Sequence, residues 1–149
     1  MTIKNYTSSV PAARSVQYIE NKLVVHGAKQ IMKEYDKDNR LSSICFIIDV
    51  NGQEMPFKLP AKMEQCQAIL TSRRKKITGE SEKRDREQAE RTAWKLLSDW
   101  TDIQMSLIEL GQVDLLEIFL PYVYDVERKQ TYYEVLKEKR FKGLLEAPK

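Results

Sequence analysis

The side chains that most often carry out catalysis are scarce in this sequence and are not spaced for it. Covalent and acid–base catalysis need a nucleophile or base that partner groups hold in place. His26, the only histidine, precedes Gly27, a pair typical of a helix C-terminus, where an imidazole can face the last carbonyl groups. Cys45 and Cys66 have no partners at metal-ligand spacing. We interpret both cysteines as buried apolar residues and not as a redox pair.

Cofactor and metal chemistry also lacks a matching pattern. The five glycines are scattered singly, so no glycine-rich loop is present to hold phosphates. Asp99, Asp102 and Glu109 lie on one stretch, of which Asp99 and Asp102 are the only close pair, and most other carboxylates are interleaved with Lys and Arg. We predict a protein that is not an enzyme and has no catalytic residue, cofactor or metal ion, while a carboxylate-only metal site stays open as the alternative.

Charged residues are the better candidates for function, because they are segregated along the chain. Nine basic and five acidic residues lie between positions 73 and 97. Clustered cations bind the phosphate backbone by releasing its condensed counterions, which makes such a cluster a candidate nucleic-acid surface. Its residues are Arg73, Arg74, Lys75, Lys76, Lys83, Arg84, Arg91 and Lys95.

The alternative interpretation of this cluster is an ordinary solvated helix surface. Three acidic residues precede an arginine by four positions, in the pairs Glu80–Arg84, Glu82–Arg86 and Glu87–Arg91. Such i,i+4 pairs have the favourable orientation for ion pairing along a helix. They would neutralise part of the cluster.

A purely acidic block follows the basic one. From residue 98 to residue 127 there are seven acidic residues and no basic residue. If residues 99–127 form a helix, this surface could dock a basic groove of a partner protein through Asp99, Asp102, Glu109, Asp114 and Glu117. We favour the alternative that the block pairs with the basic C-terminal helix, Arg128–Lys142, within one chain or between subunits.

Periodicity and breaker residues predict a three-stranded antiparallel meander over about residues 28–59, preceded by a helix over about 11–26. Residues 41–50 have apolar side chains on both faces, as a central strand does. Asn51 and Gly52 suit a tight hairpin, and Pro56 places the third strand, 53–59, at an edge. For residues 28–35, a continuation of the first helix past Gly27 is the alternative to a strand.

The part from about residue 61 to residue 142 is predicted to be helical. Pro60 opens a first helix, and Thr78–Ser81 is a flexible loop. A long helix follows over about 82–111, and it either breaks at Gly111 or continues to Pro121. Thr131 and Glu134 form a capping box that opens a last short helix.

The long helix has the strongest periodic signal. Apolar residues recur at heptad spacing, at Ala89, Ala93, Leu96, Trp100, Ile103, Leu107 and Leu110. We name these residues the heptad stripe. We favour the interpretation that the stripe covers the chain's own sheet, and a homodimer seam is the alternative.

Length and composition predict one α+β domain over residues 1–149. The chain has 149 residues, of which 42% are hydrophobic and 32% charged, enough to bury a core without disulfides. No apolar run approaches the roughly 20 residues of a membrane helix. The polar segment Met1–Val10 does not resemble a secretory signal, so we expect a cytoplasmic protein with no membrane contact.

Several short strings spread over most of the chain form a recognisable combination. They are Val10-Pro11, Arg14–Val16, Ile19-Glu20, His26–Ala28, Phe57–Ala61, Arg86–Trp94 and Phe119–Tyr122. Together they resemble a family of small uncharacterised proteins from phages and prophages of Gram-positive bacteria. This resemblance implies a mobile-element setting and the cytoplasm of an infected bacterium, and it implies no activity.

A second resemblance is one of topology. A helix, a glycine, three antiparallel strands and a helix that begins with basic residues are similar to the double-stranded RNA-binding domain, whose last helix offers cations to phosphates. Its phosphate-binding place corresponds to Lys83, Arg84, Arg86 and Arg91. The sequence departs from that pattern because the helix predicted from Pro60 to Ser72 is inserted before the basic one. Topology alone does not imply function.

These observations lead to three hypotheses. The first is a non-enzymatic accessory protein of a phage or other mobile element that binds nucleic acid, or a host nucleoprotein, through the face between Arg73 and Lys95. The second is a protein–protein inhibitor of a host defence system that uses the acidic helix 99–127. The third is a small oligomeric assembly factor.

Overall fold

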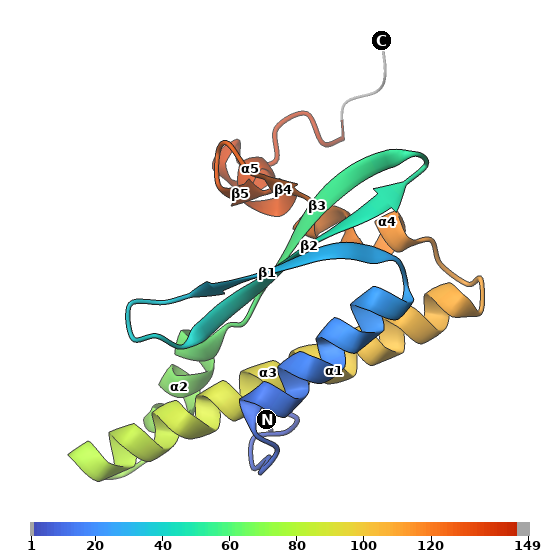
Figure 1. Cartoon of the computed structure of the whole chain (residues 1–149). Coiled ribbons are helices and arrows are strands. Elements are labelled where there is room, and N and C mark those ends of the chain that lie inside the picture. The colour runs from blue at the N-terminus through green and yellow to red at the C-terminus, as the bar shows by residue number, and fades with distance from the viewer. Residues whose placement is uncertain (1, 146–149) are drawn as a thin grey trace.

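The structure is a computed structural model that describes residues 2–145, and it has the mixed α+β fold that the sequence predicts. One helix precedes three consecutive strands, and a helical region, a small hairpin and a last helix follow them (Figure 1). The elements are α1 (Ala12–Val25), β1 (Ala28–Tyr35), β2 (Leu41–Val50), β3 (Gln53–Pro60), α2 (Met63–Ser72), α3 (Gly79–Glu109), α4 (Leu115–Phe119), the 3₁₀ helix η1 (Leu120–Tyr122), β4 (Tyr124–Asp125), β5 (Gln130–Thr131) and α5 (Tyr132–Glu138).

The three long strands form an antiparallel sheet in the order β1-β2-β3, which confirms the predicted meander. Asn51 and Gly52 turn the chain between β2 and β3 with φ angles of 52° and 83°, the left-handed conformation that a tight hairpin requires. Pro56 lies on β3, the edge strand, as its missing N–H predicts. A single bridge between Phe57 and Val123 borders β3 on its outer side.

Helices cover one face of this sheet and the C-terminal elements cover part of the other. Figure 1 shows α1 and α3 side by side beneath the sheet, with α2 against the first half of α3. On the opposite side lie α5 and the small β4–β5 sheet. None of the helices in the described part of the chain is long and apolar enough to cross a membrane.

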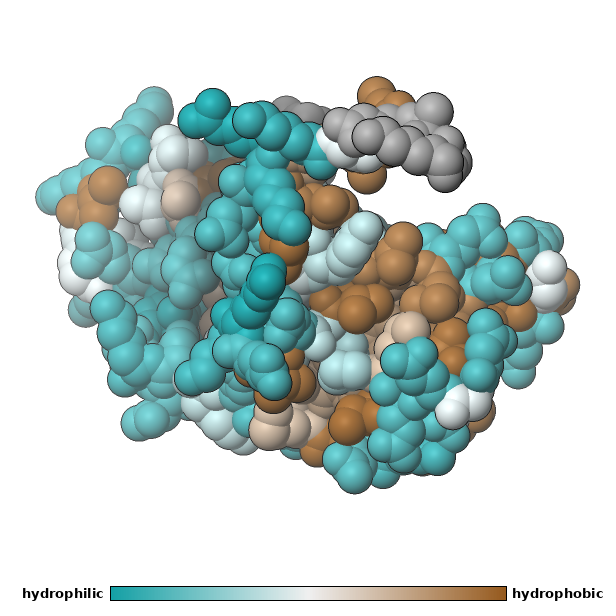
Figure 2. Space-filling model, turned by 90° about the horizontal axis from the view of Figure 1, so that it is seen from above, coloured by the Kyte–Doolittle hydropathy of each residue, from teal (hydrophilic) through white to brown (hydrophobic). Residues whose placement is uncertain are grey.

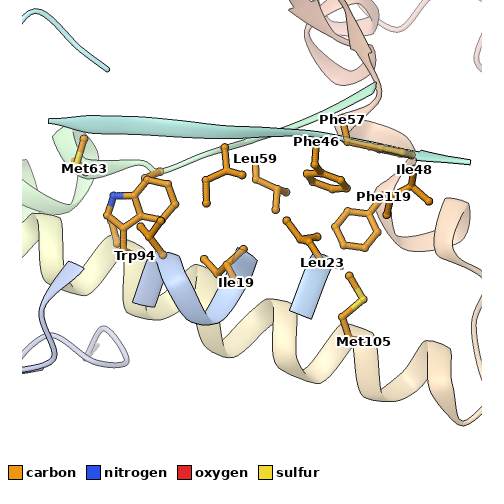
Figure 3. Close-up of a cluster of buried hydrophobic side chains, with 14 residues drawn as sticks. Ile19, Leu23, Phe46, Ile48, Phe57, Leu59, Met63, Trp94, Met105 and Phe119 are labelled. Carbon is orange, nitrogen blue, oxygen red and sulfur yellow. The ribbon is translucent and has the colours of Figure 1, made fainter. Parts of the chain in front are cut away.

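Aromatic rings join the two layers at the centre of the core. Phe46 and Phe57 stack on neighbouring strands with ring centroids 5.2 Å apart (Figure 3). Phe119 at the end of α4 meets Phe46 edge-on at 5.8 Å and Trp100 of α3 at 5.5 Å. The indole of Trp94 is fully buried and donates a hydrogen bond to the Leu41 carbonyl at 3.2 Å. Both tryptophans therefore belong to the core or pack directly against it.

Two predicted helix boundaries need correction, and one boundary that the sequence left open is decided by the structure. Pro60 is the last residue of β3, and α2 starts only at Met63. The segment Thr78–Ser81, predicted to be a flexible loop, forms the start of α3, because the Thr78 hydroxyl accepts a hydrogen bond from the Ser81 amide at 3.1 Å. The long helix ends at Glu109. Gly111 takes a φ of 73°, the left-handed conformation that commonly ends an α-helix.

Two further predictions for the helical part were incomplete. The heptad stripe is not a single buried surface, since Ala89 is fully buried while Ile103 and Leu110 are 57% and 71% exposed. The C-terminal part also contains the β4–β5 hairpin, which periodicity over two-residue strands could not reveal. The capping box of α5 is confirmed, because Thr131 and Glu134 exchange backbone-to-side-chain hydrogen bonds.

Removal of the Phe119 ring should destabilise the fold strongly, because this side chain is fully buried between β2, β3, α3 and η1. Phe119→Ala is expected to lower the free energy of unfolding by about 3–5 kcal/mol. Leu120→Ala is the control, since its side chain is 46% exposed. Urea denaturation followed by tryptophan fluorescence measures both. Equal losses in the two variants would contradict the assigned core.

Candidate nucleic-acid interface

An ion pair with a buried carboxylate fixes the loop between α2 and α3. Arg74 donates to both carboxylate oxygens of Asp85, with Nε–Oδ2 and Nη2–Oδ1 distances of 2.8 and 2.7 Å. The Thr71 hydroxyl donates to the same carboxylate at 3.1 Å, and Asp85 is only 5% exposed. Hydrogen bonds from Arg74 lower the pKa of Asp85 against the opposing effect of burial. Arg74, predicted to bind nucleic acid, is therefore an anchor of this loop.

The remaining cations of this region point to solvent on the anchored loop and on the first turns of α3. Residues 72–80 are exposed without interruption, and they include Arg73, Lys75 and Lys76. Lys83 and Arg84 are exposed one turn into the helix. We name Lys75, Lys76, Lys83 and Arg84 the cationic end. Hydrophilic residues prevail in Figure 2 at the end of the molecule where α3 begins.

The last two cations of the predicted surface are engaged in internal contacts. Arg91 donates from Nε to the Ser8 carbonyl at 3.2 Å and from Nη2 to the Gln88 side chain at 2.6 Å. Lys95 pairs with Asp99 at 3.0 Å, one turn further along α3. Arg91 therefore attaches the N-terminal segment to α3, whereas Lys95 pairs with a carboxylate of its own helix. The eight residues predicted to bind nucleic acid therefore do not form one continuous surface.

The predicted i,i+4 neutralisation takes a different form in the structure. Arg86, which the spacing pairs with Glu82, instead contacts Asp38 in the turn between β1 and β2 at 3.0 Å. That turn is also closed by Arg40 and Asp36, whose side chains are 3.2 Å apart. Tertiary partners thus replace one of the expected contacts along the helix.

The first two acidic residues of the acidic block pair with the N-terminal part of the chain. Asp99 accepts a hydrogen bond from the Asn5 amide at 2.9 Å and has Lys4 at 3.9 Å. Asp102 accepts from the Tyr18 hydroxyl at 2.9 Å and pairs with Lys22 of α1 at 3.3 Å. For these two residues the favoured pairing with the C-terminal helix within one chain is wrong, because the N-terminal segment and α1 lie beside α3 and supply their partners.

The other three residues of the predicted acidic surface lie around the turn that ends α3. Residues 99–127 are therefore not one helix. Glu109 is the last residue of α3, and Asp114 is the N-cap of α4. Glu117 accepts a hydrogen bond from the Asp114 amide at 3.2 Å, which completes a capping box. All three are exposed. The predicted acidic helix surface is therefore an acidic turn.

The remaining candidates for chemistry have structural roles. The His26 Nδ1 lies 2.9 Å from the Lys22 carbonyl at the end of α1. The Cys45 thiol is buried and donates to Glu34 Oε1 at 3.1 Å, and burial together with this hydrogen bond raises its pKa to about 12. Burial also raises the pKa of Cys66. Among residues 2–145 no three His, Cys, Asp or Glu side chains form a group that could hold a metal ion.

Comparison of the chain with protein-family models, with curated proteins and with solved structures finds no match. The resemblances to phage proteins and to the double-stranded RNA-binding domain therefore stay predictions, and function has to be argued from geometry. Periodicity did not identify the Arg74–Asp85 anchor. Its one available signal in the sequence is that Asp85 lies four residues before Ala89, the first residue of the heptad stripe, which places a carboxylate on the apolar side of the helix.

Neutralisation of Asp85 should weaken the anchor and change the response to acid. Because its pKa is lower in the folded state than in the unfolded state, its stabilising effect is complete above about pH 4 and is lost as the pH falls through the folded-state value. Asp85→Asn is expected to lower the free energy of unfolding at pH 7 and to flatten its decrease below about pH 4.

Chemical denaturation at several pH values measures this effect, with Glu82→Gln as the matched control on an exposed carboxylate of the same helix. The control is expected to follow the wild-type profile. An Asp85→Asn profile parallel to that of the wild type would contradict the assigned anchor.

Proposed function

We propose that this protein binds the phosphate backbone of nucleic acid, alone or within a nucleoprotein, through the cationic end, and that it does so without catalysis. The observation that carries this proposal is the joint exposure of Lys75, Lys76, Lys83 and Arg84 beside a carboxylate that is already neutralised. Without this pairing, the negative charge of Asp85 would offset part of the positive charge of these four side chains. Its pairing with Arg74 lets the surrounding side chains present their charge to solvent.

The geometry favours contacts to phosphates over contacts to bases. The cationic end surrounds the start of a 31-residue helix, whose dipole adds positive potential at that terminus. The exposed Glu80 and Glu82 moderate this potential, so we expect modest affinity. Trp94 is fully buried and Trp100 packs on Phe119, which leaves neither ring for base stacking. Phosphate contacts position a protein without reading sequence, so little sequence preference is expected.

The setting of this activity is supported only by the sequence. The resemblance to proteins of phages and prophages supports an accessory role in a mobile element. A second candidate, inhibition of a host defence protein through the acidic surface, has narrower support. Asp99 and Asp102 are occupied by α1 and the N-terminal segment, and only the acidic turn at Glu109, Asp114 and Glu117 stays exposed.

Fluorescence polarisation with labelled single- and double-stranded DNA and RNA tests the proposal at several salt concentrations. The wild-type protein should bind with an affinity that falls as salt rises, because binding releases counterions. Lys75→Ala/Lys76→Ala should weaken binding. On duplex DNA it should also reduce the slope of log K against log salt by about 2, at roughly 0.9 per lost phosphate contact.

The matched control is Lys62→Ala/Lys129→Asn, which removes the same charge from exposed positions outside the cationic end and outside the C-terminal segment. This control should retain the wild-type affinity and salt slope. Absence of binding to all four ligands at low salt would overturn the proposal. Equal weakening in both variants would show that net charge, and not the cationic end, is responsible.

A further inference from the structure

One side of α3 is covered along its first half and bare along its second half. Helical spacing places the buried residues Ser81, Asp85, Ala89 and Thr92 on the same side as Leu96, Ile103, Leu107 and Leu110. In the first half α2 packs against α3, and Thr71 at its end holds Asp85. Figure 1 shows that α2 does not extend along the second half of the helix.

The bare part is an apolar stripe on the outside of the molecule. Ile103 and Leu110 are 57% and 71% exposed, and Leu96 and Leu107 are half-buried. We name these four residues the outer stripe. From Leu96 to Leu110 it is about 21 Å long at 1.5 Å per residue. It consists of the members of the heptad stripe that lie outside the core. Trp100 lies between them in the sequence but packs on Phe119 of the core.

The exposed charges at the far end of the outer stripe are acidic. Between residues 98 and 127 the chain has seven acidic residues and no basic residue. Lys22 pairs with Asp102 and Lys95 with Asp99, but Glu109, Asp114 and Glu117 stay exposed at the far end of the stripe. A segment that fits this surface must therefore combine apolar side chains with positive charge.

The C-terminal segment of the same chain has this combination. Residues 137–145 contain four exposed basic side chains and three exposed apolar ones, namely Lys137, Lys139, Arg140, Lys142, Phe141, Leu144 and Leu145. Leu144 is 57% exposed and Leu145 98%. The segment follows α5, which lies across the sheet from α3 (Figure 1), so it does not meet the outer stripe of its own chain.

We propose that the C-terminal segment of one copy binds the outer stripe of a second copy, with reciprocal exchange giving a dimer. Leu144 and Leu145 would cover Ile103 and Leu110, while Lys139 and Lys142 would face the acidic turn. A parallel dimer, in which two outer stripes face each other with both α3 helices running in the same direction, would set Glu109 and its neighbours against the same carboxylates. Like charges across an interface oppose such packing. This proposal does not depend on nucleic-acid binding, because the cationic end lies at the opposite end of α3.

Charge-reversal mixing tests the proposed exchange by analytical ultracentrifugation, at protein concentrations up to about 100 μM because small interfaces are often weak. The wild type should approach twice its monomer mass of 17.5 kDa. Glu109→Lys alone should be monomeric, since it sets lysine against the basic segment. Lys139→Glu/Lys142→Glu alone should also be monomeric, since it sets acid against acid.

An equimolar mixture of these two variants should restore the dimer, because both exchanged contacts then join opposite charges. Lys75→Glu/Lys76→Glu is the control, with the same change of charge at the other end of the molecule, and it should remain dimeric. Circular dichroism confirms that every variant is folded. A monomeric wild type, or two single variants that stay dimeric, would overturn the proposal. So would a mixture that stays monomeric, which would leave the outer stripe for a different protein partner.

Discussion

The length of α3 is the constraint on which the rest of the structure depends. Its 31 residues extend over about 46 Å, whereas the 14 residues of α1 extend over about 21 Å. No other element is long enough to cover α3 alone. The sheet, α1, α2 and α4 therefore each cover a different part of it. Wherever none of them reaches, the helix and its connections are the candidate functional surfaces of the molecule.

The two uncovered ends differ in charge because their polar residues are satisfied in different ways. At the start of α3 the carboxylate of Asp85 turns inward and receives Arg74, so the neighbouring cations face solvent. At the other end the chain has no cation of its own between residues 98 and 127. Lys4 and Lys22 from the N-terminal part approach Asp99 and Asp102, but neither pairs with Glu109. The molecule is consequently positive at one end of α3 and acidic at the other.

Local patterns predicted the sheet accurately, because its determinants lie close together in the sequence. The alternation of β2, the Asn51-Gly52 turn and the edge position of Pro56 each depend on a few neighbouring residues, and all three are confirmed. The capping box at Thr131 was predicted for the same reason. The break at Gly111 stayed open, since a glycine can continue a helix or end it.

The burial of the heptad stripe and of the candidate cations depends on tertiary contacts, which local sequence patterns do not specify. Heptad spacing identifies a helix with an apolar side, but it cannot tell which neighbour covers each part of that side. Ala89 is buried where α2 packs, and Ile103 is exposed where α2 has ended. The same limit applies to the candidate site. Eight cations formed one cluster by their spacing, yet Arg74 has a carboxylate partner at 2.7 Å that lies 11 residues away, which no helical spacing rule names.

The separation of charge gives a physical reason why the proposed dimer would favour the proposed binding of nucleic acid. A polyanion is attracted to the cationic end and repelled by the acidic turn, so it would meet the protein in one orientation. The basic C-terminal segment is the obvious competitor for the same phosphates, because its four cations are also exposed. Exchange between two copies would place that segment on the acidic turn and neutralise both. The cationic ends would then be the main positive surfaces of the dimer, so self-association would direct nucleic acid to them.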